Sequence, residues 1–223
     1  MQVVRGGCRD AGLGGSSYIG RMTQTGETWQ QREAARKDVA REARDLPREP
    51  ASWGPRLAIA VATLAWLTTL VWLVATLPER VPTHWSGSTV PDDWSSRGTA
   101  LAMSVLLPLA LAYPMVWLSR LALVWPDGIN VPHKQWWLER PRRLVRFERL
   151  VREDLVLLVA ATVGLLTAVD VQIGSAAHRP GGETPGWSVP VLLGTYLLLV
   201  GLLVGRMVVG RRYRPREDDA ELA

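Results

Sequence analysis

Residues 57–77 read LAIAVATLAWLTTLVWLVATL, a run of 21 residues without a charged side chain. A helix of this length spans about 30 Å at 1.5 Å per residue, which matches the hydrocarbon thickness of a bilayer. The apolar runs of core helices in soluble proteins are shorter. The stretch therefore predicts a transmembrane helix and places the chain among integral membrane proteins.

Three further apolar runs are also long enough to span a bilayer as helices. They cover residues 99–119, 155–173 and 187–205. Pro108 and Pro114 lie inside the first of these, and each frees a backbone carbonyl that a neighbouring helix has to satisfy. We therefore expect a kinked helix there, within an all-α membrane domain of four transmembrane helices that occupies residues 57–210.

The tails on either side of this domain are polar. Glycine is frequent in residues 1–21, so this segment is expected to be disordered, and Met1 and Met22 are both possible starts of translation. A capping-box spacing predicts a helix from Thr28 to about Arg44. Residues 1–56 are therefore interpreted as a disordered or partly helical cytoplasmic tail, and residues 211–223 as a second cytoplasmic tail.

The distribution of Lys and Arg predicts the orientation. Seven of these residues lie at positions 32–56, eight at positions 120–154 and five from position 206 onward. The other two loops carry three, namely Arg80, Arg97 and Arg179. Because cytoplasmic loops carry the excess of basic residues, both termini and the middle loop are expected in the cytoplasm. The loop at residues 77–101 is then extracytoplasmic, in a multi-pass protein of the bacterial inner membrane.

The middle loop is expected to contact the inner membrane surface. A helix predicted from Pro141 has apolar residues on one side and arginines on the other: Leu144, Phe147, Leu150 and Val151 against Arg142, Arg146, Arg149 and Arg152. Such a helix lies along a membrane, where each arginine beside anionic lipid contributes on the order of 1 kcal/mol. Anionic lipid is thus an expected partner. Nucleic acid is not, because the basic residues flank apolar runs instead of forming a soluble basic face.

The sequence contains no catalytic signature, so no enzyme activity, cofactor or metal is expected. Cys8 is the single cysteine, which excludes an internal disulfide and a multi-cysteine metal site. Asp170 and Arg206 are the charged residues closest to the interior of the spans. They are expected near opposite interfaces, where each can reach water and neither can pair with the other. This arrangement argues against a pump or an ion-coupled carrier formed by this chain alone.

Three glycines predict the packing of the fourth span. Gly201 and Gly205 have the GxxxG spacing, and Gly194 lies one heptad earlier on the same helix face. Small residues in this pattern let two helix backbones approach closely. The partner helix belongs either to the same chain or to a second copy.

The loop at residues 77–101 reads LPERVPTHWSGSTVPDDWSSRGTAL, in which Asp92 or Ser96 is placed to cap the second span. It resembles the extracytoplasmic loop of a bacterial membrane domain of unknown function found in SdpI-type immunity proteins. The shared elements are Leu77-Pro78, Pro82, His84-Trp85, Pro91-Asp92, Trp94, Ser96 and Arg97. The stretch NVPHKQWWL at residues 130–138, followed by Arg142 and Arg143, resembles the cytoplasmic motif of the same group. The likeness extends over residues 58–152, and Thr89 and Ser95 depart from it because glycine is expected at both.

This resemblance implies a non-enzymatic role: immunity to, or sensing of, an extracellular peptide or envelope signal, with relay to a cytosolic partner. The residues then expected to bind the ligand are those of the extracytoplasmic loop: His84, Trp85, Asp92, Trp94 and Arg97. The residues that make up the cytoplasmic motif are Asn130, Pro132, Lys134, Trp137, Arg142 and Arg143. A subunit of a membrane transporter is the alternative from another class.

Overall fold

A computed structural model of the chain describes residues 16–125, 128, 131–209 and 211–215. It forms two compact units, Met1–Asp38 and Val39–Ala223. Helix α1 (Ser16–Asp45) begins well before the helix expected from Thr28. Residues 1–15 of the segment expected to be disordered lie outside the described residues.

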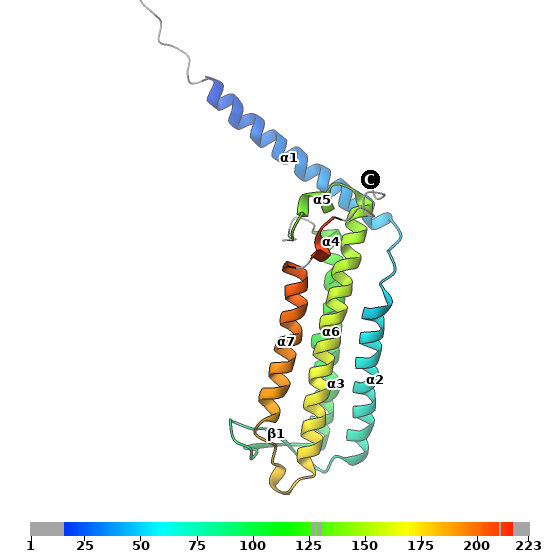
Figure 1. The fold of residues 1–223 in the computed structure, drawn as a ribbon, viewed down its shortest axis with the longest axis vertical. Coiled ribbons are helices and arrows are strands. Elements are labelled where there is room, and N and C mark those ends of the chain that lie inside the picture. Colours follow the sequence, from blue (N-terminus) through cyan, green and yellow to red (C-terminus); the bar gives the residue numbers. More distant parts are fainter. Residues whose placement is uncertain (1–15, 126–127, 129–130, 210, 216–223) are drawn as a thin grey trace, which may run out of the picture. The chain divides into compact units, whose positions relative to one another are not determined.

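Four helical segments in the described part of the chain are long and apolar enough to cross a bilayer. They are α2 (Trp53–Thr76), the segment that begins with α3 (Arg97–Leu107) and ends at Val124, α6 (Pro141–Ala177), and α7 (Ser188–Val208) with its extension to Tyr213. They run side by side in Figure 1, and α6 contacts each of the other three. Many large apolar side chains on these helices are exposed, as a lipid-facing surface requires. The prediction of four long apolar helices is confirmed.

Helix α6 differs from its prediction. It is one continuous helix of 37 residues, which corresponds to about 55 Å and exceeds the thickness of the hydrocarbon core. The prediction of a separate helix from Pro141 that lies along the membrane surface is therefore wrong, because residues 141–154 continue the axis of the span. Leu144 and Phe147 are buried in a protein core with Trp137 and Leu138 of α5 (Lys134–Leu138), and they do not face lipid.

The second span leaves regular α-helical geometry at Pro108, the first of the two prolines from which a kink is predicted. After α3 the chain passes through a π-helical turn, η1 (Pro108–Ala112), then a 3-10 segment, η2 (Tyr113–Arg120), and the short α4 (Leu121–Val124). Pro108 has no N–H to donate to the carbonyl of Ser104, four residues earlier. The indole Nε1 of Trp66 on α2 donates to that carbonyl instead, at 2.9 Å. A neighbouring helix thus satisfies the freed carbonyl and fixes the position of Ser104.

The loop between α2 and α3 contains a β-hairpin, which the all-α prediction did not include. Strand β1 (Arg80–His84) pairs antiparallel with β2 (Asp93–Ser96), and the register shifts between Pro82 and His84. Val81 is fully buried in an apolar cluster with Leu73, Leu77 and Ala100. The hairpin is therefore anchored on the ends of α2 and α3. We call this the hairpin end of the molecule.

Replacing Trp66 with Phe tests the hydrogen bond to the carbonyl that Pro108 frees. Because the Ser104 carbonyl would lose its donor in a buried environment, the free energy of unfolding should fall by about 1–3 kcal/mol. Trp117→Phe is the matched control, since Trp117 is 65% exposed, and it should change stability by less than about 0.5 kcal/mol. Reversible unfolding in mixed detergent micelles measures both. Equal effects of the two substitutions would contradict a supporting role for Trp66.

Candidate functional site

The hairpin exposes two of the predicted ligand-binding residues as a polar pair. His84 Nδ1 lies 2.7 Å from Asp92 Oδ1, and the two side chains are 64% and 43% exposed. Hydrogen bonds from the side chains of Ser86 and then His84 hold the pKa of Asp92 below its usual value of 3.8. The carboxylate is therefore ionised at neutral pH. The pair presents a charged acceptor and an imidazole on the hairpin surface.

The other three predicted residues of this loop have different surroundings. Trp94 is 36% exposed, and the Arg80 guanidinium carbon lies 5.8 Å from the centre of its ring. Trp85 is half-buried, and its indole nitrogen has no hydrogen-bond partner among the described residues. Arg97 instead turns toward the protein, where its guanidinium donates to the carbonyl of Val74 in the last turn of α2. Arg97 therefore caps α2.

Ser96, and not Asp92, caps the helix that follows the hairpin. Its hydroxyl accepts a hydrogen bond from the backbone N–H of Thr99 at 3.1 Å, which satisfies one of the free donors in the first turn of α3. Of the two residues considered from the sequence, Ser96 is the one in the cap position. Asp92 remains available on the surface.

The loop between α6 and α7 completes the hairpin end, and the sequence reasoning gave it no role. The backbone N–H of Thr184 donates to the Thr89 carbonyl at 2.9 Å. Gly182, in the 3-10 turn η4 (Pro180–Gly182), has a φ of 70° and packs directly on the ring of Trp94. The adjacent glycines at 181 and 182 were the available sequence signal for this contact. The hairpin is thus held by both of the loops at this end.

Gly182→Ala tests whether this contact orders the hairpin. An alanine Cβ there would lie 2.9 Å from Trp94 and 3.0 Å from Pro91, in a backbone conformation that costs a non-glycine residue about 1–3 kcal/mol. We expect faster amide hydrogen exchange in residues 80–96. Gly186→Ala is the control, because its Cβ would meet Thr89 at an ordinary 3.6 Å. Unchanged exchange in the Gly182 variant would show that the hairpin is ordered without this contact.

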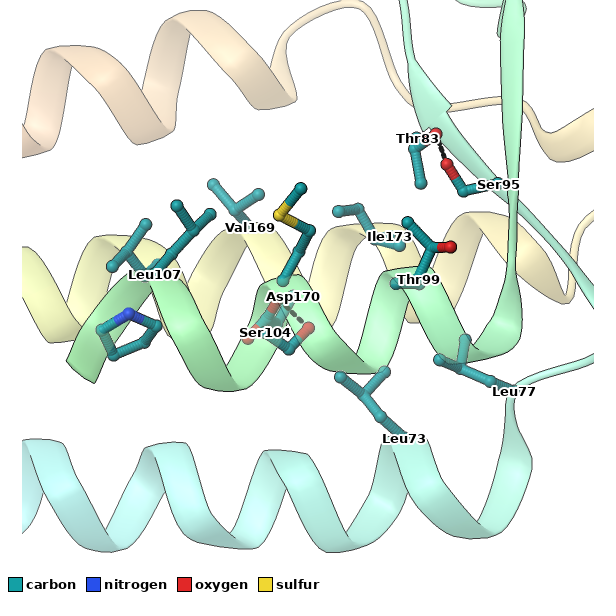
Figure 2. Close-up of a pocket in the computed structure, with 14 residues that line it drawn as sticks. Leu73, Leu77, Thr83, Ser95, Thr99, Ser104, Leu107, Val169, Asp170 and Ile173 are labelled. Atoms are coloured by element: carbon teal, nitrogen blue, oxygen red, sulfur yellow. Dashed lines mark hydrogen bonds between the residues drawn. The ribbon is translucent and has the colours of Figure 1, made fainter. Parts of the chain in front are cut away.

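A cavity of about 340 Å³ lies beneath the hairpin (Figure 2). Its hairpin side carries Thr83 and Ser95, whose hydroxyl oxygens are 3.0 Å apart. Its remaining lining is mostly aliphatic and comes from α2, α3, η1 and α6. Ser95, where the resemblance led us to expect glycine, thus supplies one of the few polar groups of this cavity.

Asp170 is the charged residue of the cavity, and its position corrects the prediction that it reaches the interface. It is 7% exposed, and its Oδ1 accepts a hydrogen bond from the Ser104 hydroxyl at 2.7 Å (Figure 2). Its Oδ2 is buried and has no hydrogen-bond partner among the described residues. Asp170 faces inward because α3 packs against this side of α6 and presents the small Ser104. Asp170 lies near the end of its predicted span, but its carboxyl group is buried inside the protein and does not reach a lipid interface.

The opposite end of the bundle, which we call the basic end, buries three more carboxylates of α6. Glu148 lies 2.8 Å from the guanidinium of Arg48, and Glu153 lies 2.8 Å from that of Arg212. Asp154 pairs with Arg212 at 2.9 Å and accepts a hydrogen bond from the hydroxyl of Tyr213, in η5 (Arg211–Tyr213), at 2.8 Å. These ion pairs fasten the linker before α2 and the segment after α7 to α6.

The arginines predicted to contact lipid take part in the same network. Arg146 and Arg149 lie 2.6 Å and 3.2 Å from Glu49, and Arg152 lies 3.6 Å from Glu148. Arg206, expected to reach the interface alone, lies 3.4 Å from Asp154. These side chains bind carboxylates of the protein, whereas Arg142 is exposed.

The predicted cytoplasmic motif divides into buried and exposed positions. The indole Nε1 of Trp137 donates to the Tyr213 carbonyl at 3.1 Å, and its ring lies 5.7 Å from that of Phe147. Arg143 lies 4.3 Å above the Trp136 ring. These residues stabilise the basic end.

The remaining motif residues are placed as follows. Pro132 is exposed, and Lys134 begins α5. Asn130 lies outside the described residues. The motif residues left accessible for a partner in the described chain therefore include Pro132 and Arg142.

Arg212→Ala tests the network. The substitution leaves Glu153 without its closest cation and Asp154 with the more distant Arg206, so we expect a loss of about 3–5 kcal/mol in the free energy of unfolding. Arg211→Ala is the neighbouring control, because Arg211 is exposed. Detergent unfolding measures both variants. If both lose the same small amount, the buried ion pairs do not stabilise this end.

The glycines of α7 do not form the predicted contact within the chain. A Cβ added to Gly194, Gly201 or Gly205 would meet no described atom within 4 Å. The α6–α7 contact uses another face, where the hydroxyls of Thr162 and Tyr196 lie 3.2 Å apart. The described residues therefore supply no close partner for this glycine face.

Comparison with known proteins identifies one segment. Residues 58–107 match the model of a family described as a domain of unknown function (DUF1648). No curated protein and no solved structure matches the chain. The matched segment contains most of α2, the hairpin and α3, so it includes Ser104 and ends before Asp170. It agrees with the expected domain of unknown function, and it carries no link to SdpI-type proteins.

Proposed function

We propose that this chain is a non-enzymatic protein of the bacterial inner membrane that recognises an extracellular peptide or envelope component with its hairpin end. The main support is the anchored hairpin, which exposes the His84–Asp92 pair and part of Trp94. Rigid aromatic and charged groups on an ordered surface are suited to binding because little entropy is lost on ligand contact. The resemblance of this loop to that of SdpI-type proteins supports immunity or sensing as the role.

The orientation is part of the proposal. The excess of Lys and Arg at the basic end supports a cytoplasmic position for that end and for both termini. Helix α6 then connects the two sides as one element, because part of the wall of the hairpin-end cavity and the carboxylates of the basic end both belong to it. A cytosolic protein would meet the exposed Pro132 and Arg142. Anionic lipid would meet Arg120, which is exposed beside a cavity at the basic end that Arg44 and Arg48 also line.

Survival of bacteria that express the chain tests this role. Cells are challenged with a panel of secreted antimicrobial peptides, and the variants His84→Ala, Asp92→Asn and Trp94→Ala are compared with the original protein. We expect protection against at least one peptide, reduced by about tenfold or more in the hairpin variants, as for loss of a binding contact of about 1.4 kcal/mol. Trp125→Ala, an exposed tryptophan at the other end, should keep protection. Equal protection by all variants at equal membrane levels would contradict the proposal.

A transporter subunit is the second candidate, and the buried Asp170 favours it. Carboxyl groups inside membrane helices commonly line ion or proton pathways. Purified protein in liposomes separates the two functions: proton or cation flux that disappears in Asp170→Asn supports transport. Sealed liposomes without flux, together with peptide protection in cells, support recognition.

A further inference from the structure

We propose that the cavity beneath the hairpin binds a cationic amphiphile, with its ammonium group beside Asp170 and its apolar part along α3 and α6. This inference goes beyond the proposed function, since it holds whether such a molecule is sensed, carried across the membrane or retained as a fixed component. It rests on the charge balance of α6, on the geometry around Asp170 and on the lining of the cavity.

The charge balance sets Asp170 apart from the other buried carboxylates of its helix. Glu148, Glu153 and Asp154 each have an arginine nitrogen within 3.0 Å. For Asp170, the described residues supply the Ser104 hydroxyl and no cation. Burying a carboxyl group without a full set of partners is unfavourable, and buried charges in proteins are generally paired. The partner that the described residues do not supply is therefore expected from a ligand.

The geometry assigns the contact to one oxygen. The Trp66 indole donates a hydrogen bond to the Ser104 carbonyl and so holds the Ser104 backbone. The Ser104 hydroxyl in turn donates to Asp170 Oδ1. Oδ2 is thereby left as a buried acceptor on a residue that lines the cavity. A primary ammonium group has three N–H donors and a positive charge, so it supplies both the hydrogen bond and the counter-charge.

The lining selects an amphiphile over a bare ion. A volume of about 340 Å³ lies at the small end of the range of ligand pockets, about 300–1,000 Å³. Most of the wall is aliphatic, for example Leu73, Val169 and Ile173. Met103 on the same wall is 54% exposed on the helix surface, which gives an apolar chain a route from the lipid phase. In the described part of the chain, no group of three His, Cys, Asp or Glu side chains is arranged for a metal.

Three probes of equal chain length test the charge requirement: octylamine, 1-octanol and octanoate. Their saturable binding to the full chain is measured by equilibrium dialysis in phosphatidylcholine nanodiscs, with empty nanodiscs as the blank. We expect one octylamine per chain, bound at least about tenfold more tightly than octanol, and no saturable binding of octanoate. In the Asp170→Asn variant, the affinity for octylamine should fall by about tenfold or more, because the ion pair contributes at least about 1.4 kcal/mol to binding. Octylamine should then bind no more tightly than octanol.

Two further variants keep the test decisive. Asp170→Asn preserves side-chain volume and an acceptor for Ser104, and its folding is followed by thermal unfolding. If the Asp170→Asn variant does not fold, Met103→Trp provides the test of the site. The larger side chain fills the cavity while Asp170 stays intact, so octylamine binding should be abolished. Equal binding of octylamine and octanol, unchanged amine binding in both variants, or displacement of octylamine by sodium at the same concentration would overturn the proposal. His84→Ala should leave amine binding unchanged, so failure of hairpin recognition is distinguishable from failure of this site.

Discussion

Carboxylates buried along α6 impose the main constraint on this structure, because a charge removed from water needs a partner of opposite sign or a hydrogen-bond donor. At the basic end the constraint is met by arginines from segments distant in sequence. Arg48 precedes α2, and Arg212 follows α7. The backbone N–H of Ser52 also donates to Glu153 at 2.7 Å, so the start of α2 is tied to the same helix. The ends of the chain's helices are thus positioned by α6.

At the hairpin end the same constraint is met by hydrogen bonds of neutral groups. Pro108 leaves a carbonyl free, Trp66 supplies its donor, and the fixed Ser104 directs its hydroxyl to Asp170. Arg97 and Ser96 satisfy the ends of α2 and α3 in a similar way. The Trp66–Ser104 and Ser104–Asp170 contacts each satisfy a polar group that is buried away from water. Two side-chain atoms of this end, the Trp85 indole nitrogen and Asp170 Oδ2, are buried without a partner among the described residues, and Asp170 is the one of these two residues that lines the cavity.

The sequence was sufficient for features that depend on local composition. Uninterrupted apolar runs located the four long helices, and Pro108 indicated both an irregular helix and the need for a donor from a neighbouring helix. Ser96 was one of two residues recognised as candidate caps. In each case the physical cause acts within a few residues of the chain, or follows from the chemistry of one residue type.

The sequence was insufficient for partners brought together by packing. Ser104 and Asp170 are 66 residues apart, and Ser52 and Glu153 are 101 apart, so no local pattern relates them. The arginines of α6 were interpreted as lipid contacts because the same amphipathic pattern results when they face a membrane or face Glu49. The α7 glycines were ambiguous for a related reason: a small-residue stripe indicates close approach without identifying what approaches.

The hairpin shares residues with the cavity beneath it, because Thr83 and Ser95 of the two strands line the cavity. Amide hydrogen exchange with and without octylamine in nanodiscs therefore tests whether the cavity binds a cationic amphiphile. We expect slower exchange in residues 80–96 together with the turns around Ser104 and Asp170, and unchanged exchange in residues 134–154 at the basic end. Exchange in residues 80–96 that is the same at saturating octylamine as in its absence would show that the cavity does not bind the amine beneath the hairpin.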